Sequence, residues 1–96
     1  MTQKISRKDE ETIPQFHSHE EARKWFKEKY GNDFMLTDVE EIGEETCYFY
    51  VLILDRSEHE KGQLELKEKG YLVGTEFLNS YQSIEIMESG FVHIVH

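Results

Sequence analysis

The five histidines and the single cysteine are the side chains whose spacing could indicate metal binding or covalent catalysis: His17, His19, His59, His93, His96 and Cys47. His17 and His19 are two residues apart ahead of a helix, which is not the H-x3-H or H-E-x-x-H spacing of zinc sites. His93 and His96 are three residues apart in an expected strand, so they should point to opposite faces. The sequence therefore predicts no metal site and no cofactor.

Motifs of the common catalytic families are also missing from the sequence. It has no G-x-S-x-G elbow, no P-loop and no G-x-G-x-x-G turn. Cys47 lies in the apolar run "CYFYVLIL", where a buried and inert thiol is expected. These features argue against an enzyme, which would need His93 or His19 within hydrogen-bond reach of a second polar group in a cleft.

The charge balance excludes two classes of partner. The 96 residues include 20 acidic and 11 basic side chains, for a formal net charge of −9. That sign disfavours binding to nucleic-acid phosphates and to anionic membranes. The longest apolar run is far shorter than the roughly 20 residues of a membrane helix, and the N-terminal residues lack the apolar core of a secretory signal. We expect a cytoplasmic protein.

Two segments are candidate binding surfaces. The first is the acidic run "DVEEIGEE" at the tip of an expected hairpin, which could bind a basic partner: Asp38, Glu40, Glu41, Glu44 and Glu45. The second follows from the loop "GYLVGTEFLNSYQS" and the strand after it, where tyrosine, amide and charged side chains are typical of adaptable contact surfaces: Tyr71, Asn79, Tyr81, Gln82, Glu85 and His93. Each also has a purely structural interpretation, as a solvated turn and as a connector packed onto the core.

The clearest predicted element is a helix that begins after Ser18 and ends near Gly31. Ser18 and Glu21 have the spacing of a capping box. The apolar positions recur at helical spacing: Ala22, Trp25, Phe26 and Tyr30.

A β-hairpin is predicted next, with strands at 34–42 and 46–54 and a turn at 43–45. The strand 46–54 is apolar on both sides, so it should be central and covered on both faces. The segment 57–69 could supply the second cover as a weak helix, capped by Ser57 and ended by Gly70, although Gly62 lies in its middle. Otherwise a second copy of the chain would cover that face, which would make a homodimer.

The last hairpin has a register that its pattern predicts. A three-residue loop ending at Gly90 pairs Ile86 with Val92 and places one apolar face inward. It also sets Glu85 opposite His93.

Together these elements predict a single small α+β domain with an antiparallel sheet of about four strands. Residues 1–15 are expected to be a flexible segment ahead of a domain spanning 16–96. The function expected from charge and size is a non-catalytic protein-binding module, acting as a regulator or inhibitor. The alternatives are a small-ligand domain, for example for a nucleotide-like ligand and possibly dimeric, and a nucleic-acid mimic that binds a basic groove.

Overall fold

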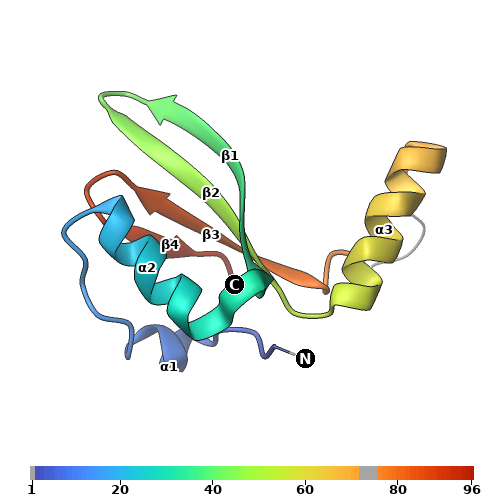
Figure 1. Cartoon of the computed structure of the whole chain (residues 1–96), viewed down its shortest axis with the longest axis horizontal. Helices are drawn as coiled ribbons and strands as arrows, with labels where there is room; N and C mark the ends of the chain where they lie inside the picture. The colour runs from blue at the N-terminus through green and yellow to red at the C-terminus, as the bar shows by residue number, and fades with distance from the viewer. Residues whose placement is uncertain (1, 72–75) are drawn as a thin grey trace.

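A computed structural model describes residues 2–71 and 76–96 and shows a small α+β domain (Figure 1). Its antiparallel sheet has four strands, as the sequence predicts, and their order is β1-β2-β3-β4. The elements in chain order are α1 (Arg7–Glu10), α2 (His19–Tyr30), the 3-10 turn η1 (Gly31–Asp33), β1 (Phe34–Ile42), β2 (Glu45–Ile53), α3 (Arg56–Lys69), β3 (Tyr81–Met87) and β4 (Val92–Ile94). No described helix is long and apolar enough to cross a membrane.

Helix α2 packs its apolar stripe against one face of the sheet. The Ser18 side chain accepts a hydrogen bond from the Glu21 backbone N–H at 3.1 Å, which caps the helix as predicted. Phe26 is fully buried and stacks on Phe34, with ring centroids 5.0 Å apart. Phe34 in turn stacks on Tyr50 at 4.3 Å, so three aromatic rings connect α2 to β1 and β2.

The predicted register of the last hairpin is confirmed. Ile86 pairs with Val92, and Glu85 pairs with His93. Gly90 has a φ of 96°, the left-handed conformation that the three-residue loop requires. A Cβ at Gly90 would also collide with the backbone of the segment before α2, so this position needs glycine for two reasons.

Helix α3 forms where the weak helix is predicted and ends at Gly70. Its cap is not Ser57, because the Asp55 carboxylate accepts the hydrogen bond from the Glu58 N–H at 3.2 Å. Gly62 leaves the space in which the Phe77 ring packs, since a Cβ there would overlap that ring. The mid-helix glycine is therefore a packing site rather than a sign against the helix.

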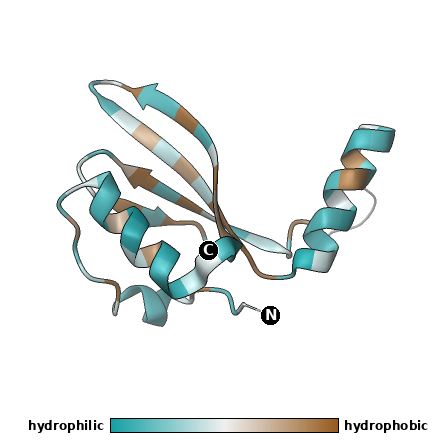
Figure 2. Ribbon diagram, in the orientation of Figure 1, coloured by the Kyte–Doolittle hydropathy of each residue, from teal (hydrophilic) through white to brown (hydrophobic). Residues whose placement is uncertain are grey.

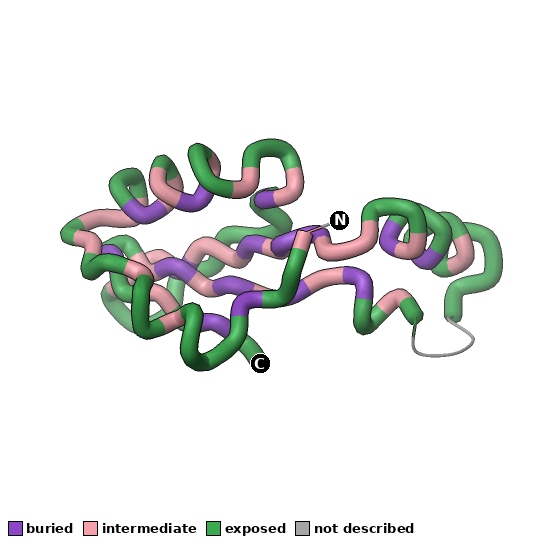
Figure 3. Tube along the Cα trace, turned by 90° about the horizontal axis from the view of Figure 1, so that it is seen from below, coloured by how far each residue is buried: buried purple, intermediate pink, exposed green. Residues whose placement is uncertain are grey.

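Helix α3 does not provide the predicted cover over the middle of β2, so that part of the expectation is wrong for the described residues, whereas cover by a second copy of the chain stays a prediction. Helix α3 extends from the end of the sheet and stands apart from it (Figures 1 and 3). Phe49 and Val51 stay partly exposed on the face away from α2. The reason is geometric: Asp55 starts α3 immediately after the strand, and Phe77 holds the helix beside the end of β3.

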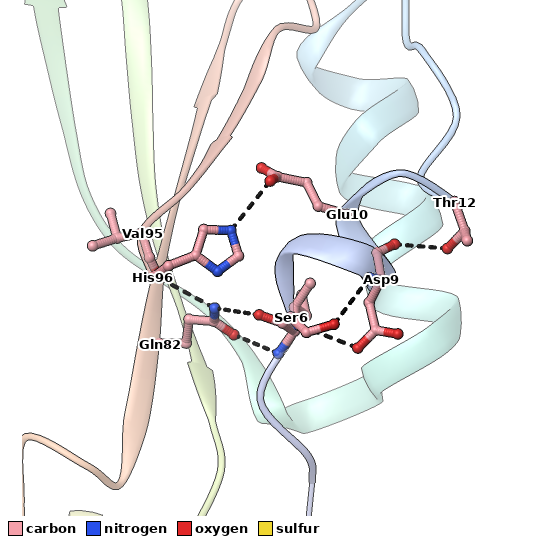
Figure 4. A network of polar contacts seen from close by, with 8 residues as sticks. Ser6, Asp9, Glu10, Thr12, Gln82, Val95 and His96 are labelled. Carbon is pink, nitrogen blue, oxygen red and sulfur yellow. Dashed lines mark hydrogen bonds and ion pairs between the residues drawn. The ribbon is translucent and has the colours of Figure 1, made fainter.

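Part of the segment 1–15 packs onto the domain, although the sequence predicts a flexible lead-in. Ile5 is 3% exposed and belongs to the core. Its backbone N–H donates to Gln82 Oε1 at 2.8 Å, and Gln82 Nε2 donates to the Ile5 carbonyl at 2.9 Å (Figure 4). His96 lies 3.1 Å from the Glu10 carboxylate and adds a contact between the two ends of the chain. Whether the rest of the segment is flexible stays a prediction.

The first prediction concerns the aromatic connection between α2 and the sheet. Phe26→Ala should lower the free energy of unfolding by ~3–5 kcal/mol, because the ring is fully buried. Trp25→Ala is the matched control and should cost less, since Trp25 is only partly buried. Denaturant unfolding of both variants measures this, and an equal loss for Trp25 would contradict the helix orientation.

The second prediction concerns Gly62. In an open helix Gly→Ala gains about 0.5–1 kcal/mol, but here the added methyl should destabilise α3 by displacing Phe77. In a Phe77→Ala background the same change should become stabilising. A double-mutant cycle by thermal unfolding, with amide exchange in α3, measures the coupling. Additive effects would show that Phe77 does not pack on Gly62.

Candidate functional site

The sheet face that points away from α2 forms the candidate site, which we call the open face. Its residues alternate with the buried core residues of β2 and β3. Across β1, β2, β3 and β4 it contains Met35, Asp38, Glu40, Ile42, Glu45, Cys47, Phe49, Val51, Ser83, Glu85, Met87 and His93.

A β-bulge decides which acidic residues reach this face. The register of β1 on β2 shifts between Leu36 and Asp38, and the Thr37 hydroxyl donates to the Phe49 carbonyl at 3.1 Å. Without the bulge, Asp38 would share the face of Leu36 and point toward α2. With it, Asp38 and Glu40 lie on the open face.

One row of residues crosses the whole open face. Asp38 pairs with Phe49, Phe49 with Glu85, and Glu85 with His93. His93 Nδ1 lies 3.7 Å from a Glu85 carboxylate oxygen. Because neighbouring strands are about 4.8 Å apart, the Phe49 ring has one carboxylate on each side. An aromatic ring between two carboxylates can hold a lysine or arginine side chain by charge and by cation–π contact.

The pKa of Cys47 reflects the negative charge on the open face. Burial raises the pKa of its thiol, and the nearby Glu85 and Glu40 carboxylates raise that pKa further. The thiol is 1% exposed and stays protonated at neutral pH, in keeping with the inert cysteine that the sequence predicts.

The structure divides the predicted acidic patch between two faces. Asp38, Glu40 and Glu45 belong to the open face, whereas Glu41 pairs with Thr46 on the side of α2. Glu44 lies in the turn between β1 and β2. Asp38 and Glu40 thus lie near Glu85, whereas the Glu45 carboxylate accepts a hydrogen bond from the Ser89 N–H at 3.2 Å, farther along the sheet.

The residues predicted around the tyrosine loop do not converge. Tyr71 is exposed just after α3, and Asn79 is exposed in the turn before β3. Tyr81 packs edge-on against His59, with ring centroids 5.7 Å apart, while Gln82 is buried against Ile5. Residues 72–75 of this loop lie outside the described residues.

Glu85 and His93, from the same predicted set, belong instead to the row on the open face. The sequence predicts that Glu85 pairs with His93. It does not predict that Phe49 and Asp38 extend this row across β2 and β1.

A polar cluster that the sequence analysis did not identify lies between α2 and β2. His19 Nε2 and the Tyr50 hydroxyl are 2.7 Å apart, and the Tyr48 ring stacks on His19 at 3.5 Å. The Tyr48 hydroxyl donates to Glu88 at 2.7 Å. The alternation of Tyr48 and Tyr50 in one strand is the only signal for it. His19 thus has a second polar group within hydrogen-bond reach, as an enzyme would need. That group, the Tyr50 hydroxyl, belongs to a residue that is only 2% exposed and does not open into a cleft.

Burial sets the protonation of this cluster. It raises the pKa of Tyr50 to about 12 and lowers the pKa of His19, against the raising effect of Glu88 and Glu20. Both groups are neutral near pH 7, which suits a hydrogen bond that holds the start of α2 on the sheet.

No group of three or more histidine, cysteine, aspartate or glutamate side chains in residues 2–71 and 76–96 is placed to hold a metal ion. Comparison of the chain with protein-family models, with curated proteins and with solved structures gives no significant match. The function must therefore be inferred from the geometry of the chain itself.

The third prediction follows from the buried His59 and the partly buried His19. His59 is 6% exposed and stacks on Phe77, and burial lowers its pKa as it lowers that of His19. A folded-state pKa below the unfolded value of 6.5 means that the unfolded chain binds protons first on acidification. Stability from these groups is complete above pH 6.5 and is lost as the pH falls toward their folded pKa values.

We therefore expect the Tm to fall as the pH drops from about 6.5 to about 5.5, above the range where most carboxylates titrate. The double variant His19→Gln/His59→Gln should be less stable at neutral pH and show a flatter pH dependence. His17→Gln, at an exposed position, is the control and should keep the wild-type slope. An unchanged slope in the double variant would contradict the assignment.

Proposed function

We propose that this protein is a non-catalytic protein-binding module whose open face binds a basic partner protein. The observation that carries the proposal is the row Asp38–Phe49–Glu85, an aromatic ring between two carboxylates on a sheet face that no described element covers. A lysine or arginine of the partner would lie on Phe49 and pair with either carboxylate.

The surroundings of the row favour a protein surface as the occupant. Met35 is 42% exposed, and Val51 and Met87 are partly exposed beside Phe49. These apolar side chains add contact area around the charged centre, in the pattern of a protein interface. The net charge of −9 would steer a basic partner toward the face.

A second copy of the chain is a weaker candidate occupant. Two open faces placed together would bring Asp38, Glu40 and Glu85 of each copy near the same residues of the other. Like charges at an interface oppose association. A basic partner removes that conflict, and binding would occupy a basic surface of the partner, as a regulator or inhibitor does.

A nucleic-acid mimic is a special case of this proposal, although its acidic residues would have to act from two faces of the hairpin.

Small-ligand binding is the second candidate function, and a cavity supports it. A cavity of about 380 Å³ lies between the segment before α2 and the β3–β4 hairpin, a volume within the usual range for ligand pockets. Its apolar lining comes from Ile13, Pro14, Phe16, Phe91, Val92 and Ile94. Its described polar lining includes Glu10 and His17 but no lysine or arginine, so an apolar neutral or cationic ligand fits better than a nucleotide.

The fourth prediction tests the basic-partner proposal with a defined probe. A peptide of six arginines alternating with glycines should shift the NMR signals of Asp38, Phe49 and Glu85, and the citrulline analogue should not. Asp38→Lys/Glu85→Lys should weaken binding more than about tenfold. Phe49→Leu should weaken it about two- to fivefold, the size of an exposed cation–π contact.

The control is Glu11→Lys/Glu68→Lys, which makes the same change in net charge at exposed positions away from the open face. This variant should lose much less affinity than the first pair. Equal losses, or equal binding of the citrulline peptide, would show that the row is not the site. A concentration-dependent dimer that dissociates on Phe49 substitution would instead favour a second copy as the occupant.

A further inference from the structure

Strand β1 is an open edge of the sheet as well as part of the open face. It is the outermost strand beside β2, and all of its residues after Phe34 are exposed. Its large apolar side chains are exposed as well: Met35 is 42%, Leu36 50%, Val39 46% and Ile42 52% exposed. Hydrophobic and hydrophilic bands follow one another along this strand (Figure 2).

The opposite edge of the sheet is protected. β4 has only three residues, Val92–Ile94. Just beyond it, the Val95 carbonyl accepts a hydrogen bond from Gln82 Nε2 at 3.1 Å, and the same Gln82 side chain holds Ile5 (Figure 4). Short edge strands and covered edges are common protections against unwanted strand pairing. The nine residues of β1 are neither short nor covered by a described element. The bulge before Asp38 and the hydrogen bond from the Val39 N–H to the Asp38 carboxylate, 2.8 Å long, are its protections, and a strand that offers Asp38 a basic side chain can replace that bond.

We propose that β1 binds an extended basic segment of the partner as an added fifth strand. The inference rests on the proposed function and specifies how the partner binds. Beyond the bulge, Asp38, Glu40 and Ile42 point to the open face, and Val39 and Glu41 point to the other. An added strand places its side chains directly beside these, about 4.5–5.5 Å away between Cβ atoms.

That alternation defines the sequence of the segment. Basic residues fit opposite Asp38, Glu40 and Glu41, and apolar residues fit opposite Val39 and Ile42. The pattern is therefore basic-apolar-basic-basic-apolar, in the order of Asp38 to Ile42. A parallel strand has this order and an antiparallel strand has the reverse.

The same acidic side chains discriminate between partners. Two β1 strands of this protein paired with each other would place carboxylates side by side, which is destabilising. The bulge before Asp38 adds a second obstacle to a long continuous pairing. The edge is thus closed to a second copy and open to a strand of opposite charge.

The test uses synthetic peptides with the core lysine-valine-lysine-lysine-isoleucine, in both orders, flanked by threonines. Only alternate amides of an added strand point toward β1. Of two derivatives N-methylated at alternate positions, one should lose more than about tenfold in affinity and the other should bind like the parent. Amide exchange should slow in 38–42 on binding of the parent peptide.

Four outcomes would overturn the proposal or separate it from the proposed function. Equal binding of both N-methylated derivatives shows charge attraction without strand addition, which rejects the edge site but leaves the open face as a basic-partner site. Protection outside β1 has the same meaning. Absence of binding by the lysine peptides, with the arginine peptide still bound at Phe49, rejects only the added strand. If neither the lysine peptides nor the arginine peptide bind, the proposed function is rejected as well.

Discussion

The stack of Phe26, Phe34 and Tyr50 is the interaction on which the rest of the fold depends. It joins α2 to β1 and β2 through two ring contacts, at 5.0 and 4.3 Å between centroids. Because Phe34 is also the first residue of β1, the stack sets where the β1–β2 hairpin starts relative to the helix. The His19–Tyr50 hydrogen bond then fixes the N-terminal end of α2 on β2.

This arrangement places nearly all of the burial on one side of the sheet. A chain of 96 residues has enough apolar surface for one modest core, and α2 with the N-terminal segment completes it. Helix α3 contacts Phe77 through its own residues His59 and Gly62 and does not add a second layer to the sheet. The open face is therefore a direct consequence of where α3 is anchored, and Gly62 is the residue that allows that anchor.

Much of the local structure could be predicted from the sequence because it depends on near neighbours. The cap at Ser18 and the loop at Gly90 follow from short-range hydrogen bonding and backbone conformation. The register of β3 and β4 follows from keeping one apolar face inward. The sequence does not distinguish Ser57 from Asp55 as the cap of α3, because both have an acceptor side chain followed three residues later by glutamate, and the prediction of Ser57 is wrong.

The features that could not be predicted depend on contacts between residues far apart in the sequence, or on a bulge that shifts the alternation of side chains along a strand. The apolar run in β2 indicated two covered faces, but burial within a strand can also come from neighbours in the same sheet, as at Cys47. Ile5 joins the core through a side-chain amide 77 residues away, for which no local pattern exists. The open-face row was hidden by the bulge at Thr37.

That bulge links the fold to the candidate function. Simple alternation from Phe34 would place Asp38 and Glu40 on the α2 side, among the core residues, at a high desolvation cost. One extra residue moves both carboxylates to the open face and brings Asp38 beside Phe49. The same shift leaves Val39 and Glu41 on the other side, so acidic groups line both faces of the β1 edge. A basic strand at that edge would neutralise carboxylates on both of its faces, whereas a partner that docks on the open face alone would leave Glu41 unpaired. The distribution of charge around β1 thus favours a partner that binds along the edge.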